Sequence, residues 1–472
     1  MVSLFLSFAI LIAAYLIFAK ITESAFGPDD RKTPAIRLAD GVDYVSMKPS
    51  RATLVELLNI AGTGPIFGAL MGACFGPVVF IWIVLGAILA GGVHDYMVGM
   101  ISERHDGKSI AELSGIYLGS AVKWIMRIFS VVLLLLTGTV FVNSPATLLA
   151  RITPSWMNET FWIVVILIYY VLATLLPIDK VIGKMYPVFG VVLIAMAVGI
   201  LGGIVFGGYS VPEVSFANLH PEELPVWPFM FVTVACGAIS GFHATQAPMM
   251  AKCITSEKYG KRVFYGAMLM ESAIALVWAA AGVAFYGTTG GLNQALSELG
   301  QSGTVYDIST HMLSTVGGIL AVVGVVICPI TSGDTAFRSA RLILAEITGL
   351  KQKEIRNRLI LTIPLLGISA ILTQLNFNVL WRYFSWSNQT LAMISLWVAS
   401  AYMLKKNAKA RTSLITAIPA TFMSAVTMTY ILLADEGFRL SRSIAYPIGI
   451  VFAALCLSAY LWVLHKAERA RL

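Results

Sequence analysis

The sequence predicts an all-α membrane protein that crosses the bilayer many times, and three observations lead to this prediction. Hydrophobic residues make up 58% of the 472 residues and charged residues only 12%, whereas soluble globular domains contain roughly 25% charged residues. The mean hydropathy is +0.81. Apolar runs of about 17–25 residues, the length that spans the hydrocarbon core of a bilayer, recur along the whole chain. Because too few polar side chains remain to cover a surface in water, a soluble fold is excluded.

Thirteen transmembrane helices are predicted from the apolar runs. The first run has its basic residues after it and no clear small-residue cleavage site, so we expect it to remain as a helix. Shorter helical patterns at about 109–122 and 335–348 fall in connections, and the second is expected to lie at the membrane interface because it mixes apolar and charged residues. The thirteen runs lie near residues 2–19, 54–75, 77–101, 124–149, 160–177, 187–207, 228–250, 263–287, 309–331, 358–375, 384–404, 412–434 and 444–464.

The distribution of lysine and arginine orients these helices. All but four of the 33 basic residues fall in alternate connections or in the tail, at 20–53, 102–127, 178–186, 251–262, 335–358, 405–411 and 465–472. The exceptions are Arg151, Arg382, Arg439 and Arg442. Since cytoplasmic loops carry an excess of basic residues, we expect a multi-pass protein of the inner (plasma) membrane with its N-terminus outside and its C-terminus in the cytoplasm. These clusters also account for the net charge of +8, so no nucleic-acid partner is predicted.

Two of the apolar runs contain residues that a continuous helix does not tolerate. In the run 54–75, the segment NIAGTGP from Asn59 to Pro65 combines two glycines with a proline. In the run 228–250, the segment CGAISGFHATQ, which begins at Cys236, crowds glycines and polar side chains into the middle of the span. Unwound backbone survives in hydrocarbon only where it is buried in protein or faces a water-filled cavity. Both helices are therefore predicted to be broken.

The two broken helices begin two five-helix blocks, 54–207 and 228–404, which the charge distribution places in opposite orientations. A helix and a connection at 1–53 precede this core, and two helices and a tail at 405–472 follow it. Secondary transporters with such inverted repeats bind substrate near the bilayer midplane, where the two discontinuous helices meet. Close helix packing is the alternative interpretation of a single glycine-rich stretch, but paired breaks at matching positions favour a binding site.

Four segments of the chain are long and specific enough to compare with known families. They are NIAGTGPIFGALMGACFGPVVFIWIVLGAILAGGVHDY from Asn59, GAISGFHATQAPMMAK from Gly237, CPITSGDTAFRSARLILAE from Cys328 and WRYFSWSNQTLAMISLWVASAY from Trp381. These segments resemble the carbon starvation protein A (CstA) family of peptide and pyruvate transporters. The resemblance implies a LeuT-like 5+5 inverted-repeat core and a secondary active transporter that takes up peptides or small carboxylates such as pyruvate, coupled to protons, by alternating access. The chain is shorter than the longer members, and Val55-Glu56 stands where members often carry a His-His pair.

Candidate substrate-binding residues lie in and beside the two breaks. A half-helix that begins near Gly64 offers free amide groups and the positive end of its dipole to a substrate carboxylate. The central His243 can change its charge near neutral pH, so it is the leading candidate for proton coupling or carboxylate recognition, with a hydrogen-bonded structural imidazole as the alternative. The substrate-binding candidates are Asn59, Gly62, Thr63, Gly64, Ser240, Gly241, His243, Gln246, Asn388 and Gln389.

His94 and Asp95, near the cytoplasmic end of the run 77–101, are further candidates for proton coupling. An intramembrane carboxylate is costly and is usually functional, paired or both. The pair is interpreted either as a proton relay or as a structural pair at the inner mouth of the transporter.

Thr331, Ser332 and Asp334 are the candidates for ion coupling in the second block. In LeuT-like transporters, a Thr/Ser pair at this position forms a sodium site together with carbonyl groups of the first broken helix. Asp334 is interpreted as neutralising a cation, taking a proton or pairing with Arg338 one turn later, and a plain helix break with a salt bridge is the alternative. The predicted coupling ion is H⁺, with Na⁺ as the alternative.

An enzyme finds less support in the sequence. Neither GxSxG nor HExxH occurs, so no catalytic residue is predicted, and a metal-dependent membrane enzyme built on His94, Asp95 and His243 is the weakest alternative. The five cysteines are scattered without a CxxC pair, so we expect no disulfide, no bound metal and no cofactor. A channel would need no paired broken helices. The predicted partners are a small-molecule substrate and the lipid bilayer.

Overall fold

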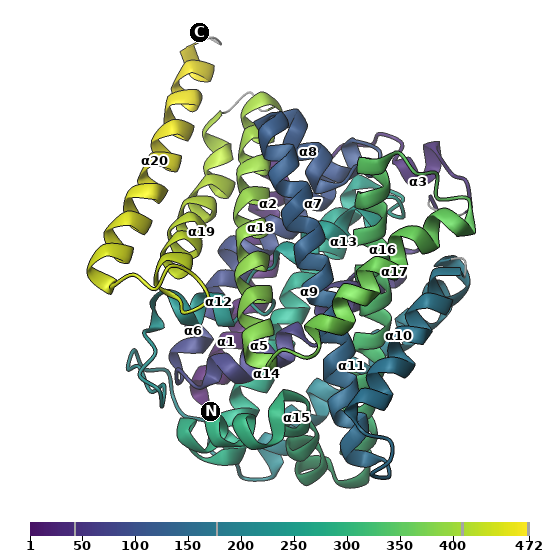
Figure 1. Ribbon diagram of the computed structural model, residues 1–472. Coiled ribbons are helices and arrows are strands. Elements are labelled where there is room, and N and C mark those ends of the chain that lie inside the picture. Colours follow the sequence, from purple (N-terminus) through teal and green to yellow (C-terminus); the bar gives the residue numbers. More distant parts are fainter. Residues whose placement is uncertain (42–43, 176–177, 407–409, 470–472) are drawn as a thin grey trace.

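The protein is a bundle of mostly upright helices in the computed structural model (Figure 1). The structure describes all residues except 42–43, 176–177, 407–409 and 470–472. The last two residues of the predicted helix 160–177 and parts of the connections 20–53 and 405–411 and of the tail therefore lie outside the described residues. The N-terminus lies low in the bundle in this view, and the C-terminus lies at its top (Figure 1).

The described helices follow the predicted runs, which confirms the all-helical fold class. Short π-helical turns join α6 to α7 at Ala87–Gly91, precede α14 at Lys261–Tyr265 and join α15 to α16 at Val323–Ile327. The α-helices are α1 Val2–Leu16, α2 Phe18–Phe26, α3 Pro34–Arg37, α4 Pro49–Ala61, α5 Gly64–Ala73, α6 Val78–Gly86, α7 Gly92–Arg104, α8 Ile110–Leu118, α9 Ser120–Ile152, α10 Glu159–Leu175, α11 Ile178–Phe206, α12 Phe231–Thr233, α13 Gly241–Ala251, α14 Gly266–Tyr286, α15 Thr289–Val322, α16 Cys328–Thr348, α17 Ile355–Leu372, α18 Phe377–Lys406, α19 Leu414–Leu433 and α20 Arg442–Arg469.

The number of membrane spans is not fixed by these helices alone. Among the described residues, nine helical stretches are long and apolar enough to cross a bilayer, or up to ten if the bent pair α4 and α5 forms one span. The predicted total of thirteen spans stays a prediction.

Three segments differ from their predicted structure. Helix α11 begins at Ile178 rather than near 187. The polar connection 288–306 is largely helical and forms the start of α15, which is kinked at Gly300 and Ser314. The pattern at 335–348 is not a separate interfacial helix. It continues α16 without a break, because residues such as Phe337 and Arg341 are buried in the protein.

The interior of the bundle holds the broken helices, and its periphery is suited to lipid. Helices α13 and α18 lie near the middle of the bundle, whereas α19 and α20 lie along one side (Figure 1). Large apolar side chains of α20, among them Ile450, Leu455 and Trp462, are exposed. Such exposure would be unfavourable in water but matches the hydrocarbon of a bilayer. The periphery therefore supports the membrane prediction.

Candidate functional site

The first predicted break is present between α4 and α5. Helix α4 ends at Ala61, α5 begins at Gly64, and their axes are bent by 51°. Gly62 takes a φ of +46°, which side chains of L-residues rarely adopt. Pro65 stands in the first turn of α5, where its missing N–H costs nothing. The glycine and the proline therefore end one half-helix and start the next, as the sequence predicts.

The second break is longer and runs through residues 234–240. The short helix α12 ends at Thr233, and α13 begins at Gly241. Ser240, just before α13, has an extended backbone. The predicted break at Gly237–Gly241 is present, and it extends three residues further toward the N-terminus than the glycine pattern indicates.

Two predicted substrate-binding residues of α18, Asn388 and Gln389, support this second break. The Oδ1 atom of Asn388 accepts hydrogen bonds from the backbone N–H of Phe242 at 2.6 Å and from the Ser240 hydroxyl at 3.1 Å. The Nε2 atom of Gln389 donates toward three carbonyl oxygens, those of Phe231 at 3.4 Å, Ala235 at 3.2 Å and Ile239 at 3.1 Å. These side chains take the place of water for backbone groups that the unwound segment leaves unpaired.

The two breaks touch each other. A Cβ atom added to Gly64 would lie 2.6 Å from the Cβ of Cys236 and closer still to its sulfur atom. At Gly62, an added Cβ would lie 2.5 Å from the ring of Phe141 in α9. A Cβ on Gly241 would lie 2.6 Å from the backbone nitrogen of Ala392 in α18. These three glycines therefore permit the close packing of the broken helices in this structure.

A cluster of ionisable side chains is buried beside the second break. The Nδ1 atom of His243 lies 2.7 Å from one oxygen of Asp95, and the Nδ1 atom of His94 lies 2.7 Å from the other. On its far side, the Nε2 atom of His243 lies 3.3 Å from Glu271 of α14, an ion-pair contact that lacks the geometry of a hydrogen bond. Glu56 of α4 is close enough to interact electrostatically with Asp95, His243 and Glu271. We call Glu56, His94, Asp95, His243 and Glu271 the buried cluster.

The buried cluster must hold protons of its own. Each of its five residues is at most 2% exposed. Among the described residues, no lysine or arginine forms an ion pair with the cluster. Three carboxylates around two imidazoles would leave negative charge unpaired in a dry interior, at a cost of several kcal/mol per ion. At least one carboxyl group or imidazole therefore carries an additional proton, and where it resides depends on the positions of α4, α7, α13 and α14.

The remaining predicted substrate-binding residues of the two broken helices contribute unpaired oxygen atoms. Asn59 of α4, Thr63 in the first break and Gln246 of α13 are all buried. The Oδ1 of Asn59, the Oγ1 of Thr63 and the Oε1 of Gln246 have no hydrogen-bond partner among the residues that the structure describes. Buried polar atoms without a partner are rare and call for an explanation such as a bound ligand or ion.

The predicted ion-coupling residues of the second block lie on α16, and Ser332 contacts the first broken helix. The hydroxyl of Ser332 donates a hydrogen bond of 3.3 Å to the carbonyl oxygen of Leu58 in α4. The Thr331 hydroxyl donates to the carbonyl of Cys328 within its own helix. Asp334 pairs with Arg338 at 3.1 Å, as expected for neighbours one turn apart. The expected helix break at this segment is wrong, because α16 continues from Cys328 to Thr348.

Sequence reasoning missed the role of Glu271 and of Glu56. Glu271 stands alone in the apolar sequence AMLMESAIALVW, and a single carboxylate in a membrane span is a signal of function. Glu56 falls within the run that contains the first break, although in the sequence it stands out only as a departure from the family pattern. The same rule that selected Asp95 would have found both.

An ion-pair network joins several connections at the end of the bundle that is predicted to face the cytoplasm. Arg104, at the end of α7, donates to both oxygens of Glu257 at 2.7 and 2.8 Å and to the hydroxyl of Tyr402 at 3.0 Å. Arg31 approaches Glu257 to 3.3 Å. The side chain of Glu257 is fully buried, and that of Arg104 is only 5% exposed. We call this the Arg104–Glu257 lock.

We expect Arg104→Gln to open this end of the protein more often. Removing one partner of a buried ion pair costs about 3–5 kcal/mol, because the other charge is left buried. The buried thiol of Cys253, which precedes Glu257 in the same connection, should then react with a maleimide several-fold faster. The half-exposed Cys456 serves as an internal reference. Lys258→Gln is the matched control, because it breaks only the exposed pair with Asp30. Equal labelling rates of the two variants would show that the lock does not hold this end closed.

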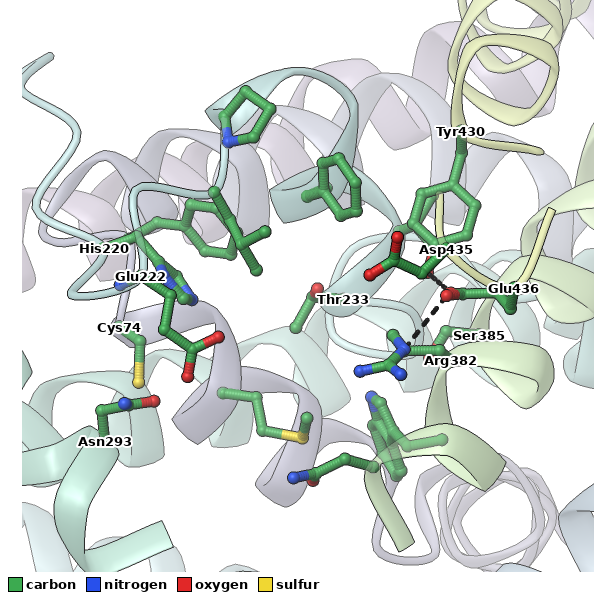
Figure 2. A pocket seen from close by; sticks show the side chains of 18 of the residues that line it. Cys74, His220, Glu222, Thr233, Asn293, Arg382, Ser385, Tyr430, Asp435 and Glu436 are labelled. Atoms are coloured by element: carbon green, nitrogen blue, oxygen red, sulfur yellow. Dashed lines mark hydrogen bonds and ion pairs between the residues drawn. The ribbon is translucent and has the colours of Figure 1, made fainter. Parts of the chain in front are cut away.

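A cavity of about 420 Å³ opens at the other end of the bundle. It lies between α5, α18 and the connections that were predicted to be outside, and Figure 2 shows side chains of its lining. Thr233, the last residue of α12, is part of this lining. In this conformation the cavity leads toward the second break, while the buried cluster remains closed to solvent.

The two discontinuous helices and the buried cluster define a class, that of helical membrane proteins with a LeuT-like transporter fold. The structure is similar over 92% of its length to a solved manganese transporter of Eremococcus coleocola, of which it covers 99%, with a TM-score of 0.55 and 14% sequence identity. That likeness concerns the fold.

The chain belongs to the carbon starvation protein CstA family, whose sequence profile matches residues 1–158, 153–302 and 283–430. An uncharacterized membrane protein of Haemophilus influenzae is 41% identical over 62% of this chain and 93% of its own length. The peptide transporter CstA of Escherichia coli is 24% identical over 84% of this chain and 76% of its own length. The pyruvate/proton symporter BtsT of Escherichia coli is 26% identical over 52% of this chain and 43% of its own length.

Proposed function

We propose that the protein is a secondary active transporter that takes up peptides or small carboxylates, pyruvate among them, together with protons. The observation that carries this proposal is the buried cluster at the second break, in which His243 joins Asp95 of α7 to Glu271 of α14. The names of the relatives, a peptide transporter and a pyruvate/proton symporter, support both the substrate class and the ion. Because the family and its named relatives are transporters, no enzymatic reaction is proposed.

Proton coupling follows from the way the cluster is built across helices. His243 lies in the first turn of α13, while its two acidic neighbours belong to α7 and α14. Any movement of α13 against these helices lengthens one contact or both. The imidazole then loses a carboxylate neighbour, which changes its affinity for a proton. A proton taken up from one side can thus be released on the other as the helices move.

Substrate recognition is proposed where the two breaks meet. Helices α5 and α13 both begin at a break, so their positive dipole ends face this region and favour a carboxylate. The unpaired oxygen atoms of Asn59, Thr63 and Gln246 offer hydrogen-bond acceptors nearby. In the proposed arrangement, the blocks 54–207 and 228–404 are inverted repeats in the inner membrane, with the N-terminus outside and the C-terminus in the cytoplasm.

Uptake into proteoliposomes tests the proposal. Radiolabelled pyruvate or dialanine should accumulate when the outside is made more acidic than the inside, with no sodium present. The accumulation should collapse when a protonophore is added. Uptake of neither compound under any ion gradient, with correctly folded protein, would contradict the proposal.

Sodium coupling on the same scaffold is the second candidate, and one contact favours it. Ser332 of α16 lies within hydrogen-bonding distance of the Leu58 carbonyl just before the first break, so both oxygens are placed to bind a cation. If sodium drives uptake, accumulation at constant pH should require a sodium gradient and should be lost in Ser332→Ala. Uptake that is independent of sodium would exclude this candidate.

A further inference from the structure

The cavity at the outer end of the bundle is lined by charged side chains of both signs. Figure 2 shows His220, Glu222 and Asn293 on one side and Arg382, Asp435 and Glu436 on the other. Arg442, at the start of α20, follows the same connection as Asp435 and Glu436 and also lines the cavity. Its volume of about 420 Å³ is within the range of small-molecule sites.

The presence of two arginine side chains in this cavity is unexpected at the end of the bundle that is predicted to be outside. The connections predicted to be outside contain only four basic residues, and two of them, Arg382 and Arg442, line the cavity. Arg382 is paired with Glu436 at 3.2 Å, and the hydroxyl of Tyr430 donates to the same carboxylate. Among the described residues, Arg442 forms no ion pair. One guanidinium group is therefore left for a ligand.

Glu222 on the opposite wall is also without a cationic partner among the described residues. Its neighbour His220 does not supply one, because burial lowers the pKa of His220 and keeps the imidazole uncharged at neutral pH. Counting the three carboxylates and two guanidinium groups of the lining, the cavity has a net charge of −1. A simple anion gains little electrostatic energy in a cavity with a net negative charge. A ligand with both charges can pair with the carboxylate of Glu222 and with the guanidinium group of Arg442.

The most deeply buried side chains of the cavity lining offer polar atoms to a ligand. Trp381 and Ser385 of α18 line the cavity, each 1% exposed. In the described part of the chain, the indole N–H and the hydroxyl have no hydrogen-bond partner. Thr233, beside them in the lining, is the residue that precedes the second break. Two buried donors without partners at this depth are a second sign of a ligand site, independent of the charges at the mouth.

We propose that this cavity, the outer vestibule, binds a small zwitterion of the size of a dipeptide through both of its charged ends, with the ammonium group at Glu222 and the carboxylate at Arg442. The vestibule selects the ligand before it reaches the region where the breaks meet. This inference rests on the proposed transport function. According to this inference, residues outside the broken helices select zwitterions over simple anions.

Binding of three matched ligands to the purified full-length protein tests the vestibule. Dialanine carries both charges, N-acetyl-dialanine lacks the ammonium group, and dialanine amide lacks the carboxylate. We expect dialanine to bind about three- to tenfold more tightly than either derivative. Glu222→Gln should remove the advantage over N-acetyl-dialanine, and Arg442→Gln should remove the advantage over the amide.

Each variant has a matched control in the same connection. Glu223→Gln alters the acidic neighbour of Glu222, and Arg439→Gln alters an exposed arginine paired with Asp435, and neither residue lines the cavity. Equal affinity of the wild-type protein for all three ligands, or equal effects of the test and control variants, would overturn the proposal.

The outcome for the vestibule can be separated from that for transport. If the protein transports pyruvate but does not distinguish the three ligands, the proposed function stands and the vestibule proposal fails. If no compound is transported but dialanine binds in a manner that depends on Glu222 and Arg442, the vestibule stands and the proposed function fails.

Discussion

His243→Ala should fold, and its initial rate of proton-driven substrate uptake should fall by at least about 100-fold, the lower end of the rate contribution of a side chain positioned for proton transfer. His243 is the residue that joins Asp95 to Glu271. Without it, Asp95 keeps only His94, and Glu271 loses the contact at 3.3 Å. The measurement is accumulation of radiolabelled pyruvate or dialanine in proteoliposomes under an inward proton gradient.

Exchange transport distinguishes loss of coupling from loss of folding. Exchange of labelled for unlabelled substrate at equal pH needs no net proton movement, so it should survive in His243→Ala. His94→Ala is the matched control, because it removes the other histidine of the same carboxylate and leaves the contact between Asp95 and His243 in place. Normal proton-driven accumulation by His243→Ala would place the coupling group elsewhere.

Valine at Gly62 or Gly64 is expected to raise the apparent KM for carboxylate substrates steeply or to abolish uptake. At Gly62 the φ of +46° strains any side chain, and at Gly64 a Cβ atom would overlap Cys236. Overpacking of this kind typically costs about 1–3 kcal/mol, and at Gly64 it would also push the two breaks apart. Asn59→Ala should have a milder effect, because it removes one side-chain oxygen and leaves the backbone unchanged.

A second-site variant separates packing from recognition of the carboxylate. The double variant Gly64→Ala with Cys236→Gly removes the atoms that the new Cβ would meet, so close packing of the breaks becomes possible again. If Gly64 acts by packing alone, this double variant should transport with a KM near that of Cys236→Gly. If the amides at Gly64 bind the carboxylate, the new methyl group should still raise the KM. Near-normal uptake by the single Gly62 and Gly64 variants would show that the carboxylate is bound elsewhere.

The local chemistry of the breaks could be predicted from the sequence, whereas their surroundings could not. Glycine and proline act on their own backbone, so Gly62 and Pro65 indicate where α4 ends and α5 begins. The longer extent of the second break depends on Gln389, which reaches it from α18, more than a hundred residues away. A pattern within one segment contains no information about such a partner.

The same distinction holds for the buried cluster. Each of its ionisable residues is conspicuous in an apolar run, but the contact between Asp95 and His243 joins positions 148 residues apart. The expected break near Thr331 was wrong for a related reason. Helix α16 is continued by burial of Phe337 and Arg341 in the protein, and tertiary packing of this kind is not visible in hydropathy.

Gln389 has a consequence for how easily the second break can bend. Its amide nitrogen has two hydrogens, whereas three carbonyl oxygens lie within 3.4 Å of it. One carbonyl is therefore left over in any arrangement with two single hydrogen bonds. When the second break bends, one carbonyl group can therefore leave the Gln389 amide as another takes its place. Bending between α12 and α13 would then exchange hydrogen bonds without first losing them.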